Sequence, residues 1–514
     1  MRRSVPLVSA LGGVLAVAGL MAVRTSAESA DFGLFVQQLL HSHSEQLFGF
    51  SHPLTESAIG PYDGADNLQA IVVAQGLHVS LVSSSVASAA DQIALWPDDE
   101  NPKYLFVCDE ETSNPAVQRV DLSKPAASNA TTIVTGLSSC DPVRRTPWGT
   151  IIVAEEAGAT GGLYEILDPV NITTPINVTD RLAGTTTDPN HLVKRKAVGS
   201  LSFESFAITP DGTMIYGDEL APSGGTAGGG IYKFVPTNPY AGTGQPPVTM
   251  PMLSPLVSGD IFGLRVAANG SSNWGQGAEI GKGRWTAVDK APAGVVDAAG
   301  NTILRNAQVL QKFTGYYRPE DMDVDPEAAK DGIFRACWAN TGRLNSGGGT
   351  TLENSAVYGE VMCLVEEASA AAPTGTIPVV TRFVAGSQQM GMPDNVAFQP
   401  HTGNLVVLED GPTSITTATG TQPRGNDLWI CLPDGDDDDV LTDGCVRFAS
   451  IRDTSAEPTG FIFTASGESA YVNIQHRAVN DAAGPGNHGA LVKISGFKVN
   501  GRHHSNDDDH GHGH

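Results

Sequence analysis

The chain is short of charged residues, and most of the charge that it has is of one sign. Only 17% of its 514 residues are charged, and 31 basic residues stand against 56 acidic ones, for a formal net charge of −25. A hydrophobic fraction of 40% with so few charges excludes a disordered chain. The shortage of basic residues argues against a nucleic-acid-binding protein, because neutralising phosphates requires basic patches.

Beyond the first 27 residues the sequence also lacks any apolar run long enough to span a membrane, and it has no collagen-like glycine repeat. What it has in quantity is Gly (58) and Pro (32), with many Thr, Val and Ser. Low charge together with turn-forming and β-branched residues is typical of an all-β, turn-rich protein. The length suits two or three ordinary domains or one large toroidal or barrel domain.

Residues 1–27 form a targeting segment. Arg2 and Arg3 give it a basic start, residues 5–23 are uncharged and mostly apolar, and residues 25–27 (Thr-Ser-Ala) offer a small-residue cleavage site. This arrangement predicts an export signal, and the arginine pair suggests twin-arginine export. The alternative is an uncleaved membrane anchor. We expect cleavage, a periplasmic or secreted location, and no stable membrane insertion of the mature protein.

Cysteine is scarce, with six in the whole chain, and an even number in an exported protein suggests disulfides. The candidate pairs, from the strongest to the weakest, are Cys431 with Cys445, Cys337 with Cys363, and Cys108 with Cys140.

Both ends of the mature chain differ from its middle. Apolar residues at helical spacing in residues 31–50 predict one amphipathic helix, within a helical extension at residues 28–60 that precedes the main domain at 61–500. Residues 501–514 contain five His and three Asp and predict a disordered tail that could capture transition metal. A tag-like or scavenging role suits this tail better than catalysis. Nothing in the sequence indicates an oligomeric state.

Between these ends, short Val/Ile/Thr/Tyr/Phe runs alternate with Gly, Pro, Asn and Asp clusters, which predicts many short strands. One pattern recurs: a tight turn joins two strands, and polar, often acidic residues follow the second strand. It occurs at residues 146–156, 208–219, 398–410 and 463–473, and more loosely at 323–336. Such repetition favours the blades of a β-propeller, which point equivalent strand ends into one central funnel. A pair of sandwiches, the alternative, would scatter them.

Several polar clusters sit at these strand ends and could carry chemistry. They are Cys140-Asp141 with Glu155-Glu156, Glu204 with Asp218-Glu219, Arg318-Pro319-Glu320-Asp321, Asp394-Asn395 with Glu409-Asp410, and Glu457 with His476. Carboxylates at short separations cannot all stay ionised without cations, and hard oxygen ligands select calcium or ferric-type ions. If the clusters meet, they predict a cation-binding funnel; taken singly, each is also typical of surface carboxylates and turns.

The same stretches resemble those of a known family. They are Thr-Pro-Trp-Gly-Thr at 146–150, with a Cys upstream and Glu-Glu downstream, Tyr-Arg-Pro-Glu-Asp at 317–321, Pro-Asp-Asn-Val-Ala-Phe at 393–398, Glu-Pro-Thr-Gly-Phe at 457–461 and Val-Asn-Ile-Gln-His at 472–476. In this order, over most of the mature chain, they resemble the PhoX-type alkaline phosphatase family.

The resemblance implies a six-bladed propeller whose funnel holds ferric iron and calcium. It also implies an exported enzyme that hydrolyses small-molecule phosphate esters, by attack of a metal-activated oxygen nucleophile. By motif position, Arg318 would grip the phosphoryl oxygens, for which a bidentate fork is suited. The implied metal ligands are Cys140, Glu155 or Glu156, Glu204, Glu320 and Asp394.

Departures from the family pattern keep alternatives open. Family members commonly have a small, Gly-rich stretch between the Cys and Thr-Pro-Trp, whereas residues 141–145 here are bulky and charged. Cys140 is therefore either an iron-bridging thiolate or half of a disulfide with Cys108, which would remove the iron site. Two other functions remain. A calcium-dependent lactonase or esterase also uses an acidic funnel but does not need Arg318, and a non-catalytic exported propeller could have lost its metals and act as a binding module.

Overall fold

The computed structural model describes residues 34–60, 62, 66–111, 116–222, 227–242, 247–266, 280–342, 358–367, 376–387, 389–411, 414–417, 420–434, 442–476 and 489–499. The expected export signal at 1–27 and the His/Asp-rich tail at 501–514 lie outside these residues. Among the helices that are described, none has the length and apolar character needed to cross a bilayer.

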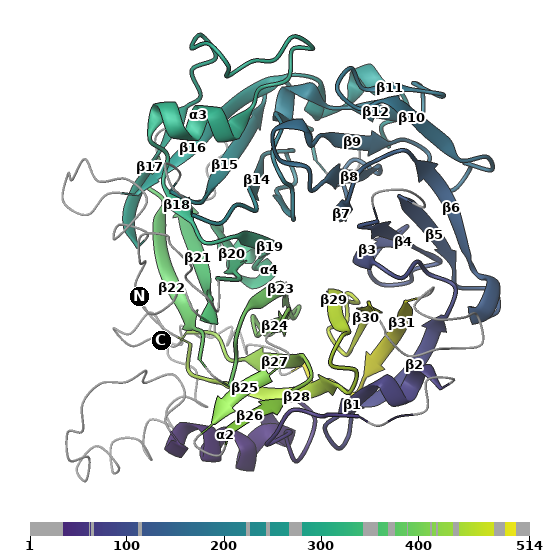
Figure 1. The fold of residues 1–514 in the computed structure, drawn as a ribbon, viewed down its shortest axis with the longest axis vertical. Helices are drawn as coiled ribbons and strands as arrows, with labels where there is room; N and C mark the ends of the chain where they lie inside the picture. The colour runs from purple at the N-terminus through teal and green to yellow at the C-terminus, as the bar shows by residue number, and fades with distance from the viewer. Residues whose placement is uncertain are drawn as a thin grey trace, which may run out of the picture.

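The strands form six blades arranged in a ring (Figure 1), which confirms the propeller expected from the repeated hairpins. We number the blades in chain order and give the strands of each from the ring axis outward. Blade 1 contains β3 (Ala90–Trp96), β4 (Tyr104–Asp109), β5 (Val117–Asp121), β6 (Ala130–Thr135), β10 (Ile176–Asp180) and β11 (Thr185–Thr186). Blade 2 contains β7 (Cys140–Arg145), β8 (Ile151–Glu155), β9 (Leu163–Ile166) and β12 (Leu192–Lys194).

Blades 3 and 4 share one continuous sheet, because their outer strands β17 and β22 pair at Gly281 and Val380. Blade 3 contains β13 (Phe206–Ile208), β14 (Met214–Gly217), β15 (Gly229–Pro236), β16 (Gly259–Val266) and β17 (Gly281–Ala287), with β18 (Gly315–Tyr316) beside β15. Blade 4 contains β19 (Pro319–Val324), β20 (Ile333–Asn340), β21 (Glu360–Glu367) and β22 (Val379–Ala385).

The last two blades close the ring with strands from the start of the described chain. Blade 5 contains β23 (Pro393–Phe398), β24 (Leu405–Glu409), β27 (Asp427–Cys431), β28 (Cys445–Ile451) and β1 (Ile71–Val73). Blade 6 contains β29 (Glu457–Phe463), β30 (Ser469–Gln475), β31 (Ala490–Ser495) and β2 (His78–Ser83). The strands β25 (Ser414–Thr417) and β26 (Gly420–Pro423) pair with each other in a separate two-stranded sheet. Because β1 and β2 pair with strands near the C-terminus, the ring is fastened by hydrogen bonds between distant parts of the chain.

The described residues contain few α-helices, and α4 (Pro326–Lys330) alone lies near the inner strands, in the β19–β20 connection of blade 4 (Figure 1). The predicted N-terminal helix is α2 (Leu34–Leu47), which contacts β28; Leu40 and Leu47 are buried there with Phe48 and Phe50 (Figure 1). The other α-helices described are α3 (Leu304–Gln311) and α4. Burial of one apolar face against blade 5 explains why the short α2 is stable.

Each of the five predicted hairpins joins the first and second strands of a blade. The segments 146–156, 208–219, 323–336, 398–410 and 463–473 correspond to blades 2, 3, 4, 5 and 6. The tight turns work because glycine adopts positive φ in them, as at Gly212 (φ 92°) and Gly467 (φ 71°). The inner strands of successive blades then contact one another around the axis, which brings equivalent strand ends together.

Candidate active site

Because the hairpins are antiparallel, residues at the start of a blade's first strand and residues at the end of its second strand lie at the same end of the ring. The first strand of a blade begins where its second strand ends, so that Ala90 pairs with Asp109 in blade 1 and Pro393 with Glu409 in blade 5. The residue that follows each member of such a pair in the sequence therefore faces the axis. This geometry converts a repeated sequence pattern into one shared site.

Twelve side chains from all six blades line a pit on the axis with a volume of about 210 Å³, which we call the acidic pit. One carboxylate comes from the start of the first strand of each blade, and these form the inner ring: Asp91, Asp141, Glu204, Glu320, Asp394 and Glu457. The outer ring follows the second strands: Glu110, Glu156, Glu219, Asp410 and His476. Blade 4 also contributes Arg318, just before β19.

Where two acidic residues are adjacent at the end of a second strand, their side chains point in opposite directions. In a strand, successive side chains point to opposite faces, so only one member of each pair can reach the pit. Glu155 is fully buried and receives Arg181 Nε at 2.5 Å, while its neighbour Glu156 lines the pit. Asp218 likewise pairs with Arg305 Nε at 2.8 Å. Of the two alternatives Glu155 and Glu156, the structure therefore brings Glu156 to the pit, whereas the charge of Glu155 is compensated by Arg181 inside the blade.

Arg318 is held across the pit wall by two carboxylates. Its Nε donates to Glu219 Oε1 at 2.6 Å, and its Nη2 lies 2.8 Å from Glu320 Oε1. The charge of Glu320 is the main reason that the pKa of Arg318 is raised. The backbone of Arg318 has φ 51° directly before Pro319, a conformation that L-residues seldom adopt. Such backbone strain persists where the surrounding structure fixes a side chain in a particular position, as at functional sites.

Ten carboxylates in the pit face one arginine and one histidine. Burial, reinforced by the neighbouring carboxylates, raises the pKa of Asp91, Asp141, Glu204, Asp394 and Glu457 well above the ordinary range. Burial also raises the pKa of Glu156 to about 7, and that of Glu320 to about 8 despite the charge of Arg318. The pit is therefore built to attract positive charge from outside the chain.

Hydrogen-bond donors from the protein are too few to satisfy these oxygens. Gln475 Nε2 serves three carboxylates at once: Asp91 Oδ2 at 3.2 Å, Glu110 Oε2 at 3.1 Å and Glu457 Oε1 at 3.0 Å. Oδ1 of Asp91 is buried and has no hydrogen-bond partner among the described residues. An orphaned oxygen of a buried, ionised carboxylate is unfavourable unless the acid is protonated or a cation binds it.

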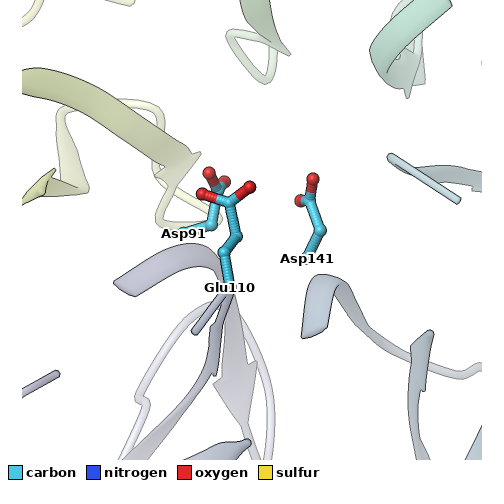
Figure 2. Close-up of side chains that lie close together, drawn as sticks. All are labelled: Asp91, Glu110 and Asp141. Atoms are coloured by element: carbon cyan, nitrogen blue, oxygen red, sulfur yellow. The ribbon is translucent and has the colours of Figure 1, made fainter. Parts of the chain in front are cut away.

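Two groups of carboxylates have the spacing of cation sites. In one group, oxygens of Asp91, Glu110 and Asp141 all lie within 4.8 Å of one another, and Figure 2 shows their carboxylates gathered around one space. In the other, oxygens of Glu156, Glu204 and Glu219 do the same. Both groups offer oxygen ligands, which suit hard cations such as calcium.

Cys140 does not reach the pit. It forms a disulfide with Cys108 of the neighbouring blade and is buried in an apolar cluster. The other two predicted disulfides, Cys337–Cys363 and Cys431–Cys445, are also present, and each joins paired strands within one blade. Of the two alternatives that the sequence left open for Cys140, the structure forms the disulfide with Cys108, which leaves no thiolate at this position to bind a metal.

Arg144 of blade 2 contacts residues of three other blades. Its Nη1 donates to Gln92 Oε1 at 2.7 Å, and its Nη2 contacts Ser205 Oγ and Asp321 Oδ1, each at 3.0 Å. The charged stretch that departs from the family pattern therefore has a structural role, because Arg144 ties blade 2 to residues of blades 1, 3 and 4.

The pit brings together Glu156, Glu204, Arg318, Glu320 and Asp394, all named as candidates from the sequence. Asp141, Glu219, Asp410, Glu457 and His476 stood in the noted clusters without an assigned role. Sequence reasoning missed Asp91 and Glu110, both from blade 1. The signal that could have found them is the acidic run Asp109-Glu110-Glu111 at the end of β4, which repeats the pattern of the other hairpins.

The fold and site define a six-bladed β-propeller with a carboxylate-lined axial pit. Comparison with protein families then gives a specific match, because the family model described as alkaline phosphatase PhoX matches residues 65–478. The chain belongs to the PhoX alkaline phosphatase family and is a metal-dependent phosphatase. No curated protein sequence matches the chain.

A solved structure of a family member has a similar fold. Pseudomonas fluorescens PhoX in complex with vanadate, a transition state analogue, aligns with a TM-score of 0.62 at 16% identity, covering 87% of this chain and 98% of that one. A luciferin-regenerating enzyme aligns with a TM-score of 0.42 at 10% identity, covering 83% and 97%. The calcium-binding protein regucalcin from Agrobacterium tumefaciens aligns with a TM-score of 0.40 at 11% identity, covering 82% and 94%.

Proposed function

We propose that this enzyme hydrolyses small-molecule phosphate monoesters in the acidic pit, where Arg318 binds the phosphoryl oxygens and calcium occupies the carboxylate groups. The observation that carries this proposal is the convergence of ten carboxylates and one arginine on the axis. A surface of this charge would repel a phosphate ester unless cations were bound there.

The residues present fit calcium and do not fit thiolate-ligated iron. Two groups of three carboxylates have suitable oxygen spacing, and the buried Oδ1 of Asp91 needs a positive partner. Bound cations would neutralise charge on the non-bridging phosphoryl oxygens. The Cys140 sulfur that the family resemblance assigned to iron is held in a disulfide, so we assign no step to that iron.

Arg318 is the residue best placed to bind the phosphoryl group. It lies in the pit wall, and a planar guanidinium can bind two phosphate oxygens at once. Glu219 and Glu320 fix its orientation from two sides. Electrostatic stabilisation by such preorganised donors is strongest in the transition state, where charge spreads over the equatorial oxygens.

We also propose a periplasmic or secreted location and capture of transition metal by the tail at 501–514. The basic, apolar and small-residue order of residues 1–27 supports export. Three disulfides support an oxidising compartment, since cytosolic proteins rarely keep them. The five histidines of the tail support metal capture.

The test is a substrate survey on the full-length mature protein with calcium restored after chelation. We expect hydrolysis of p-nitrophenyl phosphate at alkaline pH, weaker or no hydrolysis of its diester, and none of a sugar lactone. Lactone hydrolysis that survives Arg318→Met would favour the lactonase alternative. If calcium is bound and no phosphate ester reacts, the proposal is wrong.

A further inference from the structure

We propose that the cation centre of this enzyme is built from oxygen ligands alone. Asp91, Glu110 and Asp141 form one site for a hard divalent cation of the calcium class, without thiolate-ligated iron. The inference rests on the proposed function only in that the acidic pit binds cations. It concerns which ligand atoms do so in this chain.

The repeat of the fold itself places Asp141, not Cys140, in the ligand position. Cys140 and Ala90 occupy the same place in their blades, since each pairs with the last residue of the second strand. The next residues, Asp141 and Asp91, both line the pit. Because side chains alternate along a strand, a residue one step before the ligand position points away from the axis.

The direction of Cys140 is fixed covalently. Its sulfur is bonded to Cys108, and both residues are fully buried among apolar side chains between blades 1 and 2. The described residues include all six cysteines of the chain, and none of them is free. The oxidised protein therefore has no thiolate to offer a metal anywhere.

A second, independent observation indicates that a cation binds at Asp91. Asp91 is only 4% exposed, and its Oδ1 has no hydrogen-bond partner among the described residues. Its Oδ2 shares the single amide of Gln475 with Glu110 and Glu457. The carboxylates of Asp91, Glu110 and Asp141 face one another across a common space, within 4.8 Å (Figure 2).

Charge and ligand type then select the ion. Three carboxylates give the site up to three negative charges and only oxygen donors. Carboxylate oxygens completed by water suit calcium and related hard cations, whereas thiolate ligands select softer metals.

The experiment measures metal content and calcium binding, with no reference to phosphatase activity. Purified full-length protein is analysed for calcium and iron, stripped with chelator, and titrated with calcium chloride by calorimetry. We expect calcium without stoichiometric iron, and no visible thiolate-to-iron absorption band. Asp141→Asn should weaken the tightest calcium site by on the order of 100-fold. Asp260→Asn, an exposed carboxylate on β16, is the charge-matched control and should bind calcium normally.

The double variant Cys108→Ser, Cys140→Ser tests the sulfur directly and should keep its calcium affinity. If it fails to fold, alkylation of the native protein followed by mass spectrometry gives the same information, and Cys140 should stay unmodified until reduced. Stoichiometric iron that disappears on Cys140→Ser, a free Cys140 thiol, or wild-type calcium affinity in Asp141→Asn would overturn the inference. Loss of phosphatase activity with calcium still bound would instead count against the proposed function alone.

Discussion

Two regions of this propeller bury several charges, and they treat them in opposite ways. Within blade 5, Glu409 and Asp427 are matched by Arg424 and Arg447, and all four side chains are nearly inaccessible to solvent. Glu409 also accepts hydrogen bonds from Trp429 Nε1 and two backbone amides. We call this group the balanced cluster. In the acidic pit, by contrast, ten carboxylates have one arginine and one histidine.

The difference separates a structural role from a functional one. Burying charge is tolerable when partners of opposite sign come from the same chain, and the balanced cluster meets this condition. The acidic pit does not, so its stability depends on something that the chain lacks. Two adjacent residues show the contrast: Glu409 belongs to the balanced cluster, and Asp410 lines the acidic pit.

The largest effect is expected from breaking the balanced cluster. Arg424→Met leaves Glu409 buried without its main partner, and removing one member of a buried ion pair typically costs about 3–5 kcal/mol. Urea denaturation should show this loss of stability, with calcium affinity unchanged. Adding Glu409→Gln in the same chain should recover part of the loss. Unchanged stability in Arg424→Met would mean that the cluster does not carry its assigned role.

Removing the one arginine of the acidic pit should affect catalysis more than folding. We expect Arg318→Met to lower kcat/KM by about 10²–10³-fold, the usual effect of losing a donor to transition-state charge. Arg318→Lys should recover only part, because it cannot form the bidentate fork. Arg145→Met is the control, since Arg145 pairs with Asp99 outside the pit. Steady-state assays decide, and equal losses in both variants would contradict the assignment.

A smaller and opposite effect is expected from removing one carboxylate of the inner ring. Burial, reinforced by the charges of Asp141 and Glu320, raises the pKa of Glu204, so Glu204→Gln removes a carboxylate that is unfavourable in the metal-free protein. We expect the metal-free variant to melt at a higher temperature than the wild type, and calcium to stabilise it less. Thermal melts with chelator and with calcium measure both terms. Destabilisation of the metal-free protein would show that the acid is held by favourable contacts instead.

The smallest effect is a pH dependence confined to the metal-free protein. Burial raises the pKa of Glu156 to about 7 and of Glu320 to about 8, from ordinary values of 4.5. The folded state then holds protons that the unfolded chain releases, so stability falls as pH rises from about 4.5 through 8. Saturating calcium should flatten this decline, because the cation replaces the protons. Melting temperatures across this range test the sign, and a rise toward pH 8 without calcium would reverse it.

The hairpins show how far the sequence could be interpreted alone. Blades 2, 3, 5 and 6 have a compact turn with a polar cluster after the second strand, and these were predicted; blade 4, whose β19–β20 connection contains α4, matched the pattern only loosely. In blade 1, β3 and β4 are instead connected by a longer Pro- and Asp-rich turn, Pro97-Asp98-Asp99-Glu100-Asn101-Pro102. Because this turn differs from the others, neither the hairpin nor its pit residues Asp91 and Glu110 were recognised from the sequence. The same limitation applied to Glu155, whose partner Arg181 lies beyond the next strand and could not be paired with it from spacing.

By itself, the sequence determined the β-rich class, the repeated hairpins and the family motifs, because turn residues and strand patterns act over a few positions. Only the tertiary structure decided which oxygen of each acidic pair reaches the axis, because register and alternation send neighbouring side chains in opposite directions. It also decided that Cys140 meets Cys108, since that bond depends on two blades lying side by side. Interactions between residues close in sequence thus determine the strands and turns, whereas closure of the ring determines which side chains meet.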